Sequence, residues 1–365
     1  MRKYKLPSLV IGGLEINPPF IQGGMGVRVS KANLAAAVAK EGCAGVISTV
    51  GLGEFENRPG SEFVKLNEQA LRDEIKKARK MTDGVIGVNV LVALSNYENL
   101  VKTAAEEGAD LIICGAGLPL DLPLITEGHT SKLVPIVSSA RALSIICRKW
   151  KQYNKKPDAV VVEGAKAGGH LGFDYDDLVN GKARDLDEIL TEVIAVANSF
   201  DNHIPVVAAG GIFDGKDIAR VLNLGASGVQ MATRFVCTDE CDVHPNFKMA
   251  YINSKKEDIT IIKSPVGMPG RVINNAFVER IKKGETVPFK CAFKCLKSCN
   301  PRTAPYCIAK VLLRAAEGHL EEAFAFAGEN AYRCKEIVPV KKLINELAEE
   351  AAYHLNKMKP AQGLA

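Results

Sequence analysis

Short runs of apolar, often β-branched residues recur eight times along the first 235 residues of the chain, and most end in glycine, serine, threonine or a polar residue. The runs are almost continuously apolar and do not alternate, which is typical of parallel strands that are buried on both faces. They lie at residues 19–26, 45–51, 85–93, 111–117, 133–139, 159–165, 204–211 and 228–235.

Helix-like segments separate these runs. Ser30 is a candidate N-cap for a segment that ends at Gly42, and further helical patterns follow the third and seventh runs. Eight strands that alternate with helices predict a (β/α)8 TIM barrel, an α/β fold. The alternative is an open doubly wound sheet, but no G-x-G-x-x-G sequence joins a first strand to a first helix, so the pattern favours the barrel.

The pattern changes after about residue 240. A loop rich in glycine and proline is followed by a cysteine-rich stretch at residues 291–307 and by two amphipathic helical segments, at about 308–327 and 335–357. We therefore predict a barrel of residues 1–254 and a mostly helical extension of residues 255–365 that packs on it.

Composition and charge exclude several classes of protein. The net charge of +5 is spread over 365 residues without a dense block of lysine and arginine, which argues against nucleic-acid binding. Gly12, Gly13 and Glu15 interrupt the apolar stretch near the N-terminus, and no apolar run reaches the roughly 18 residues of a membrane span. We expect a cytoplasmic protein whose ten cysteines are thiols and not disulfides.

The ends of the last two predicted strands suit a phosphate group. In TIM barrels, phosphate commonly binds between the loops that follow strands seven and eight. Gly210 and Gly211 follow the seventh run and present backbone N–H groups without a Cβ atom, and Thr233 adds a hydroxyl at the end of the eighth. The alternative is that the glycines only form a tight turn; we predict a phosphate site.

His170 follows two glycines in the loop after the sixth predicted strand. A single histidine is more often a structural residue than a catalyst, but the end of a barrel strand is where catalytic groups gather. An unperturbed imidazole titrates near neutrality and can donate or accept a proton. We therefore predict that His170 is catalytic.

Six motifs in a fixed order resemble one family of flavoenzymes. The motifs are PFIQGGMG, GVNV, the AGGH of KAGGHLG, AAGGIFDGKDIA, GASGVQMATRF and HPNFK. Over about residues 18–275 the chain resembles the nitronate monooxygenases, also called 2-nitropropane dioxygenases, and the flavin-dependent type II enoyl-ACP reductases. The resemblance implies FMN at the barrel mouth and His170 as the catalytic histidine, which protonates the substrate in the reductases and acts as a base or orienting group in the monooxygenases.

The resemblance also assigns cofactor contacts, some to the flavin ring and some to its phosphate. The predicted cofactor-binding residues are Gly24, Met25, Asn89, Glu163, Gly168, Gly169, Gly210, Gly211, Gln230, Met231, Ala232 and Thr233.

Two positions depart from the family pattern. Many relatives have glutamate where this chain has Lys166, and monooxygenase relatives often have glutamine where it has Glu163. We hypothesise that Lys166 favours a substrate with an anionic group.

Four cysteines lie within seventeen residues, in the pattern C-x3-C-x3-C-x7-C. The first three have the spacing of one helical face, and Pro301 and Pro305 then break the helix. Three interpretations stand: a [4Fe–4S] cluster, a zinc site and unliganded thiols. We predict the cluster, with the ligands Cys291, Cys295, Cys299 and Cys307.

These features predict an FMN-dependent oxidoreductase. The leading hypothesis is reduction of an activated C=C bond, such as that of an enoyl thioester, with hydride from reduced FMN and a proton through His170. One alternative is oxidation of alkyl nitronates with O2; another is a flavin and iron–sulfur protein that only relays electrons. A cluster beside FMN implies a one-electron carrier such as ferredoxin, while NAD(P)H as direct donor and a homodimer are left open.

Overall fold

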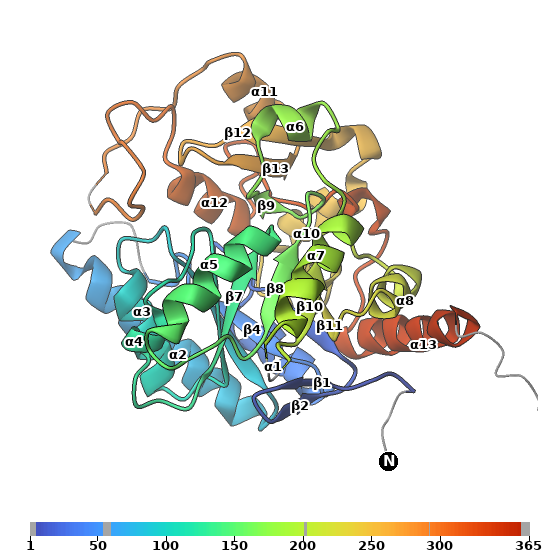
Figure 1. Ribbon diagram of the computed structural model, residues 1–365. Helices are drawn as coiled ribbons and strands as arrows, with labels where there is room; N and C mark the ends of the chain where they lie inside the picture. Colours follow the sequence, from blue (N-terminus) through green and yellow to red (C-terminus); the bar gives the residue numbers. More distant parts are fainter. Residues whose placement is uncertain (1–4, 54–59, 201–202, 292, 359–365) are drawn as a thin grey trace, which may run out of the picture.

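Eight parallel strands form the centre of the computed structural model, which describes residues 5–53, 60–200, 203–291 and 293–358 (Figure 1). The strands are β3 (Phe20–Gln22), β4 (Gly45–Ser48), β5 (Ile86–Leu91), β6 (Leu111–Gly115), β7 (Lys132–Val137), β8 (Val160–Glu163), β10 (Val206–Ala209) and β11 (Gly228–Met231). Every predicted apolar run overlaps one of them, with β7 beginning one residue before its run, so the predicted TIM barrel is confirmed.

The strands follow one another around the barrel in the order β3-β11-β10-β8-β7-β6-β5-β4. The two ends of this sheet approach each other through a single parallel bridge between Ile21 and Ala44, so the barrel is nearly closed. All eight strands point the same way, and their carboxyl ends meet at one mouth.

Helices surround the barrel in the order that the alternating pattern predicts. They are α1 (Ala32–Lys40), α2 (Phe63–Met81), α3 (Tyr97–Glu106), α4 (Leu122–Ile125), α5 (Ala140–Lys151), α7 (Leu186–Asn198) and α8 (Gly215–Asn223), with a short α6 (Tyr175–Val179) before α7.

Side-chain caps start several of these helices. Ser139 accepts a hydrogen bond from the N–H of Ala142 at the start of α5, as N-cap residues do. Ser30 is not the cap that the sequence predicts: α1 begins after Lys31, and the Ser30 hydroxyl accepts the N–H of Met25 at 2.7 Å. Ser30 therefore fixes the loop after β3 at the barrel mouth.

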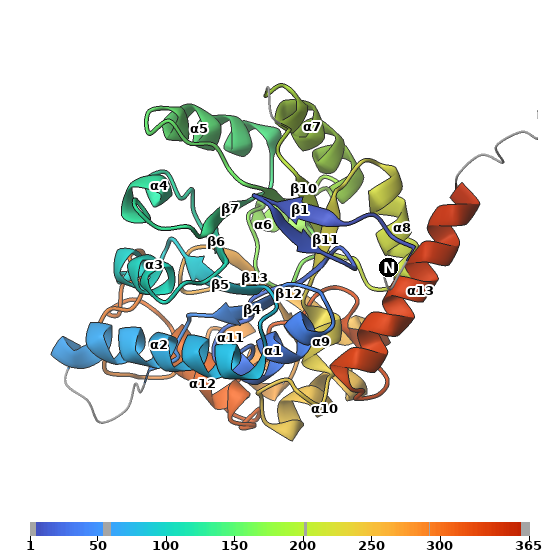
Figure 2. The same ribbon diagram turned by 90° about the horizontal axis from the view of Figure 1, so that it is seen from below.

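A hairpin that the sequence pattern does not predict closes the opposite end of the barrel. Its strands are β1 (Leu9–Ile11) and β2 (Leu14–Ile16), and Figure 2 shows them across the amino-terminal end of the barrel. Leu9, Ile11 and Ile16 are fully buried in one apolar cluster with inward-facing strand residues such as Val161. The barrel interior is therefore a packed core, and its mouth is the end where a ligand can bind.

The extension covers this mouth (Figure 1). Its strands β12 (Ile259–Lys263) and β13 (Pro269–Ile273) form a three-stranded sheet with β9 (Gly169–His170). The helices beyond β11 are α9 (Thr233–Val236), α10 (Pro245–Asn253), α11 (Ala276–Lys282), α12 (Ile308–Ala316) and α13 (Val340–Met358). The division at residue 254 stays a prediction.

The two predicted C-terminal helices are shorter than their patterns. The first ends at Ala316 because Gly318, with φ +92°, follows it, and the second begins at Val340, after Pro339. Of the helices in the described ranges, none combines the length and apolar character that a membrane crossing needs.

Candidate active site

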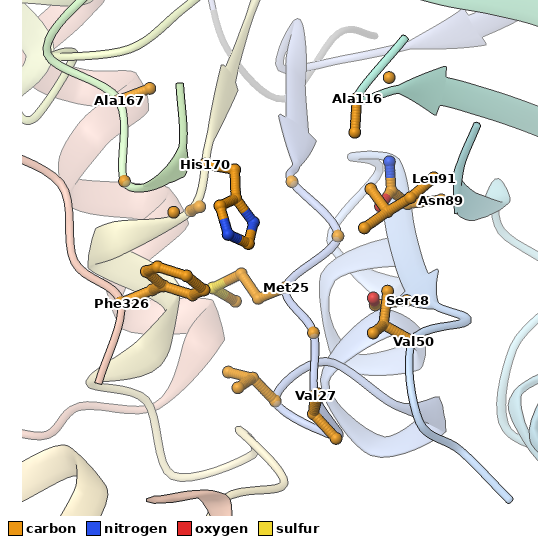
Figure 3. A pocket seen from close by; sticks show the side chains of 18 of the residues that line it. Met25, Val27, Ser48, Val50, Asn89, Leu91, Ala116, Ala167, His170 and Phe326 are labelled. Carbon is orange, nitrogen blue, oxygen red and sulfur yellow. The ribbon is translucent and has the colours of Figure 1, made fainter. Parts of the chain in front are cut away.

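A cavity of about 300 Å³ opens at the carboxyl ends of the barrel strands, within the size range of small-molecule sites (Figure 3). The loop after β8, the β12–β13 hairpin and the segment at residues 326–330 also line it. The structure thus gathers in one cavity wall His170 and all the predicted cofactor-binding residues: Gly24, Met25, Asn89, Glu163, Gly168, Gly169, Gly210, Gly211, Gln230, Met231, Ala232 and Thr233.

Four polar side chains lie at the ends of barrel strands around this mouth. Ser48 on β4 is paired with Asn89 on β5, while Glu163 on β8 and Gln230 on β11 flank Ala209 on β10 between them. Asn89 donates to the carbonyl of Ile113 at 3.2 Å. The Ser48 Oγ and Gln230 Oε1 atoms are buried and have no hydrogen-bond partner among the described residues. A bound group or ordered water would satisfy these atoms.

The loop after β10 has the open backbone expected of a phosphate site. Gly210 and Gly211 have φ values of +88° and +87°, a conformation that side chains rarely adopt. A Cβ atom on Gly210 would lie 2.7 Å from the carbonyl oxygen of Gly164. Only glycine fits this position without a shift of the β8 loop.

Residues 328–330 of the extension, which sequence reasoning missed, contact the part of the cavity predicted to bind phosphate, called the phosphate end below. The Asn330 side chain donates to the carbonyl of Gly211 at 2.8 Å, and the N–H of Glu329 donates to the carbonyl of Lys166 at 3.1 Å. A Cβ atom on Gly328 would lie 2.5 Å from the Thr233 hydroxyl oxygen. The glycine of the G-E-N sequence at residues 328–330 was the available signal, but it stands far from the barrel motifs.

His170 lies on β9 with its imidazole toward the cavity (Figure 3). Its Nε2 atom is 2.7 Å from the Ser264 hydroxyl oxygen, and the ring of Phe326 packs against the imidazole with centroids 4.9 Å apart. Burial lowers the pKa of His170 to about 4, so the imidazole is neutral at neutral pH. This differs from the unperturbed titration assumed from the sequence.

Arg271 holds the loop that leads to His170. Its buried guanidinium donates through Nη1 to the carbonyls of Ala165 and Ala167, at 2.6 and 2.7 Å. Its Nη2 lies 3.6 Å from a carboxylate oxygen of Glu329. The sequence did not mark Arg271, because the two carbonyls that accept its hydrogen bonds are more than a hundred residues away.

We expect Arg271→Met to loosen this loop. Two carbonyls would lose a charged donor, and a hydrogen bond to a charged group contributes about 1.5–3 kcal/mol. The free energy of unfolding, measured with urea, should fall by about this amount, and amides of residues 164–170 should exchange faster with deuterium. The free energy of unfolding of Arg271→Lys, which keeps one charged donor, should lie between the values of wild type and Arg271→Met. Equal stability of all three proteins would contradict the role of Arg271 in holding this loop.

Residue 291 and residues 293–307 of the cysteine stretch, as far as the structure describes it, form no helix, contrary to the prediction from the cysteine spacing. It is an extended loop because its backbone pairs with the β5–α3 loop: the N–H of Ser95 donates to the Cys295 carbonyl at 3.0 Å, and Leu296 forms a bridge with Leu94. Lys294 has a φ of +42°, and its N–H donates to the Cys291 sulfur at 3.2 Å.

The predicted cluster is not supported by this loop conformation. All ten cysteines are free thiols. In the part of the chain that the structure describes, no three histidine, cysteine, aspartate or glutamate side chains are arranged to hold a metal ion. Cys295 does line the cavity, so the loop borders the candidate active site.

Comparison with known proteins agrees with this arrangement. Residues 8–107 and 95–350 match the model of the nitronate monooxygenase family. The chain belongs to this family. Its members are FMN-dependent oxidoreductases, and the unpartnered polar atoms and glycine loop of the cavity fit a flavin with its phosphate.

Individual relatives carry different names. A probable nitronate monooxygenase of Staphylococcus aureus (strain MSSA476) is 29% identical over 304 residues, which cover 74% of this chain and 79% of the relative. The structure of FabK from Thermotoga maritima is 29% identical with a TM-score of 0.73, covering 93% of this chain and 94% of that one. Nitroalkane oxidase from Streptomyces ansochromogenes, at 22% identity and a TM-score of 0.73, covers 93% of this chain and 97% of its own and shows the shared fold alone.

Proposed function

We propose that this FMN-dependent oxidoreductase reduces an electron-poor C=C bond, such as the α,β-double bond of an enoyl thioester. The observation that carries the proposal is the apolar half of the cavity. There the extension contributes Val266, Met268, Leu296, Leu312 and Phe326. Such a wall favours an acyl chain over a small polar nitronate, because burial of each CH2 group contributes about 0.8 kcal/mol.

The other half of the cavity would hold the cofactor. Gly210, Gly211 and Thr233 would bind the phosphate, and Asn89 and Gln230 would bind the polar edge of the ring. Bound FMN supplies the hydride that reduces the double bond. The chain's own residues must then orient the acceptor, exclude water and deliver one proton.

His170 and Ser264 can deliver that proton together. If Nε2 accepts the hydroxyl hydrogen of Ser264, the neutral imidazole carries its own proton on Nδ1. Transfer of the Nδ1 proton to the substrate, with uptake of the serine proton at Nε2, leaves the imidazole neutral again. The Ser264 oxygen then takes a proton from water. This relay needs no charged imidazole, which agrees with the lowered pKa.

Lys166 would favour binding of a substrate that carries an anionic group. Its side chain is exposed at the edge of the cavity, where it can meet a phosphate or carboxylate that stays in water. Unchanged kinetics of Lys166→Ala with every acidic or phosphorylated substrate would contradict this role.

Nitronate oxidation is the second candidate, favoured by the name of the Staphylococcus relative. In that reaction His170 would accept or orient a proton and O2 would take the electrons. The test compares anaerobic reduction of an enoyl thioester, with either NAD(P)H or the chemically reduced enzyme as the source of electrons, with O2 uptake on propionate 3-nitronate or 2-nitropropane. Enoyl reduction supports the proposal; rapid O2 uptake without enoyl reduction would replace it with nitronate oxidation.

We also propose that the cysteine loop rearranges to hold a [4Fe–4S] cluster, fed by a one-electron carrier such as ferredoxin. The thiols of Cys291, Cys299 and Cys307 are near enough to Cys295 to influence it electrostatically. Lysines at residues 290, 294 and 297 would compensate the negative charge of four thiolates.

The cluster is tested by anaerobic purification with iron, sulfide and zinc analysis. We expect about four iron and four sulfide per chain, lost in Cys299→Ser but kept in Cys147→Ser, a buried thiol on α5. Stoichiometric zinc would indicate the zinc site instead, and flavin without any metal would leave NAD(P)H as the donor.

A further inference from the structure

Glu163 occupies an unusual place in the barrel. Its neighbour two positions earlier on β8, Val161, points into the barrel interior, and strand alternation therefore points Glu163 inward as well, one layer nearer the mouth. Inward-facing Ile136 and Ala209 lie in the same region of the cavity wall. The carboxyl group thus sits on top of an apolar core, at the base of the site proposed for FMN.

No protein group neutralises this carboxyl. Glu163 makes no hydrogen bond or ion pair with a described residue, and burial alone raises its pKa to about 7. The neighbouring strands β7 and β10 present no titratable side chain to the cavity. The other titratable side chains that line it are Lys166, His170, Tyr251, Cys295 and Glu329, none of them in contact with Glu163 as an ion pair.

A second polar atom nearby shares this lack of partners. Gln230 Oε1 lies on β11, with only β10 between it and Glu163, and is buried without a hydrogen bond in the described chain; Ser48 Oγ, also buried and unpartnered, lies across the mouth on β4. A ligand that satisfies such a rim needs several donors and acceptors along one edge. The flavin ring has such an edge, with carbonyl oxygens on either side of an N–H group.

We propose that Glu163 binds the flavin ring as a neutral carboxylic acid that donates its O–H to a ring carbonyl, so that loss of this proton weakens FMN binding. The inference rests on the FMN site of the proposed function. A carboxylate in this position would place its charge against the lone pairs of a carbonyl with no cation to compensate it, in a region where charge interactions are poorly screened.

The sign of the pH dependence follows from proton linkage. If only the protonated form binds FMN well, the dissociation constant of FMN rises tenfold for each pH unit above the pKa of the free carboxyl. Between about pH 6 and about pH 9 this predicts roughly a hundredfold loss of affinity. Glutamine keeps an N–H donor in the same shape but cannot ionise, so E163Q should lose this dependence.

The experiment titrates apoprotein with FMN and follows the quenching of flavin fluorescence across this pH range. The affinity of wild type for FMN should fall roughly a hundredfold from the lower to the upper pH limit, and E163Q should bind FMN with nearly constant affinity. In E188Q, which removes an exposed carboxylate on α7 outside the cavity lining, the affinity for FMN should fall with pH as it does in wild type. A second titration with riboflavin, which lacks the phosphate of FMN, shows whether titration of that phosphate contributes to the pH dependence. Circular dichroism verifies the fold of each apoprotein at both pH limits.

Two results would overturn the inference: equal pH dependence in wild type and E163Q, or wild-type affinity that rises with pH, as a carboxylate acceptor requires. The measurement needs no substrate, so failure of the reductase proposal leaves it intact. Absence of FMN binding at every pH would overturn both the inference and the FMN site on which it rests.

Discussion

Replacement of His170 by alanine is expected to lower the kcat for enoyl reduction by about 10²–10⁴-fold, the usual contribution of a positioned acid or base. FMN content should stay near that of wild type, because the imidazole bonds Ser264 and packs on Phe326 and not on the phosphate end. Steady-state kinetics and flavin absorbance on the same preparations give both quantities.

The Ser264→Ala variant separates proton delivery from general damage. It leaves the imidazole in place but removes the donor to Nε2, so the loss of kcat should be smaller than for H170A. Because the pKa of His170 is about 4, neither limb of the pH profile between about pH 5 and about pH 8 should belong to this imidazole. Turnover by H170A at the wild-type rate would exclude the relay and favour an electron carrier without a substrate of its own.

Gly210→Ala is expected to remove FMN from the purified protein. The alanine Cβ would meet the Gly164 carbonyl at 2.7 Å, and the φ of +88° is itself unfavourable for alanine. Left-handed backbone costs about 1–2 kcal/mol for a residue with a side chain, and relief of the clash must shift the loop that would bind phosphate. The ratio of flavin to protein absorbance and the urea unfolding curve measure the two effects.

Gly128→Ala is the matched control for backbone strain. Gly128 has a similar φ of +82°, but no atom lies within 4 Å of the position of its Cβ. The Gly128→Ala variant should have a free energy of unfolding lower by about 1–2 kcal/mol and should keep its flavin. If both variants lose FMN equally, strain and not the shape of the β10 loop is responsible.

The barrel could be predicted because its signal is local. Each strand is a continuous apolar run, and glycines mark the turns at their carboxyl ends, as at Gly210 and Gly211. The β1–β2 hairpin was missed because its strands have only three residues each, too few for periodicity to register.

The candidate site could be predicted only in its barrel half. Ser264, Arg271 and Asn330 meet the barrel loops across 94 to 119 positions of sequence, and nothing local marks such a contact. The cysteine spacing predicted a helix from i, i+4 recurrence, but Leu296 pairs with Leu94 in the loop after β5, and this backbone pairing holds the cysteine loop in a non-helical conformation. Tertiary hydrogen bonds overrode the local pattern there.

The short strand β9 belongs to the barrel by sequence and to the extension by hydrogen bonding, since Gly169 and His170 pair with Arg271 and Gly270. The two parts of the proposed chemistry thus depend on different parts of the chain. The barrel would bind the flavin, and the extension would orient His170, the proposed proton donor. Changes confined to the hairpin at residues 259–273 would therefore alter the orientation of His170 while leaving the barrel strands as they are.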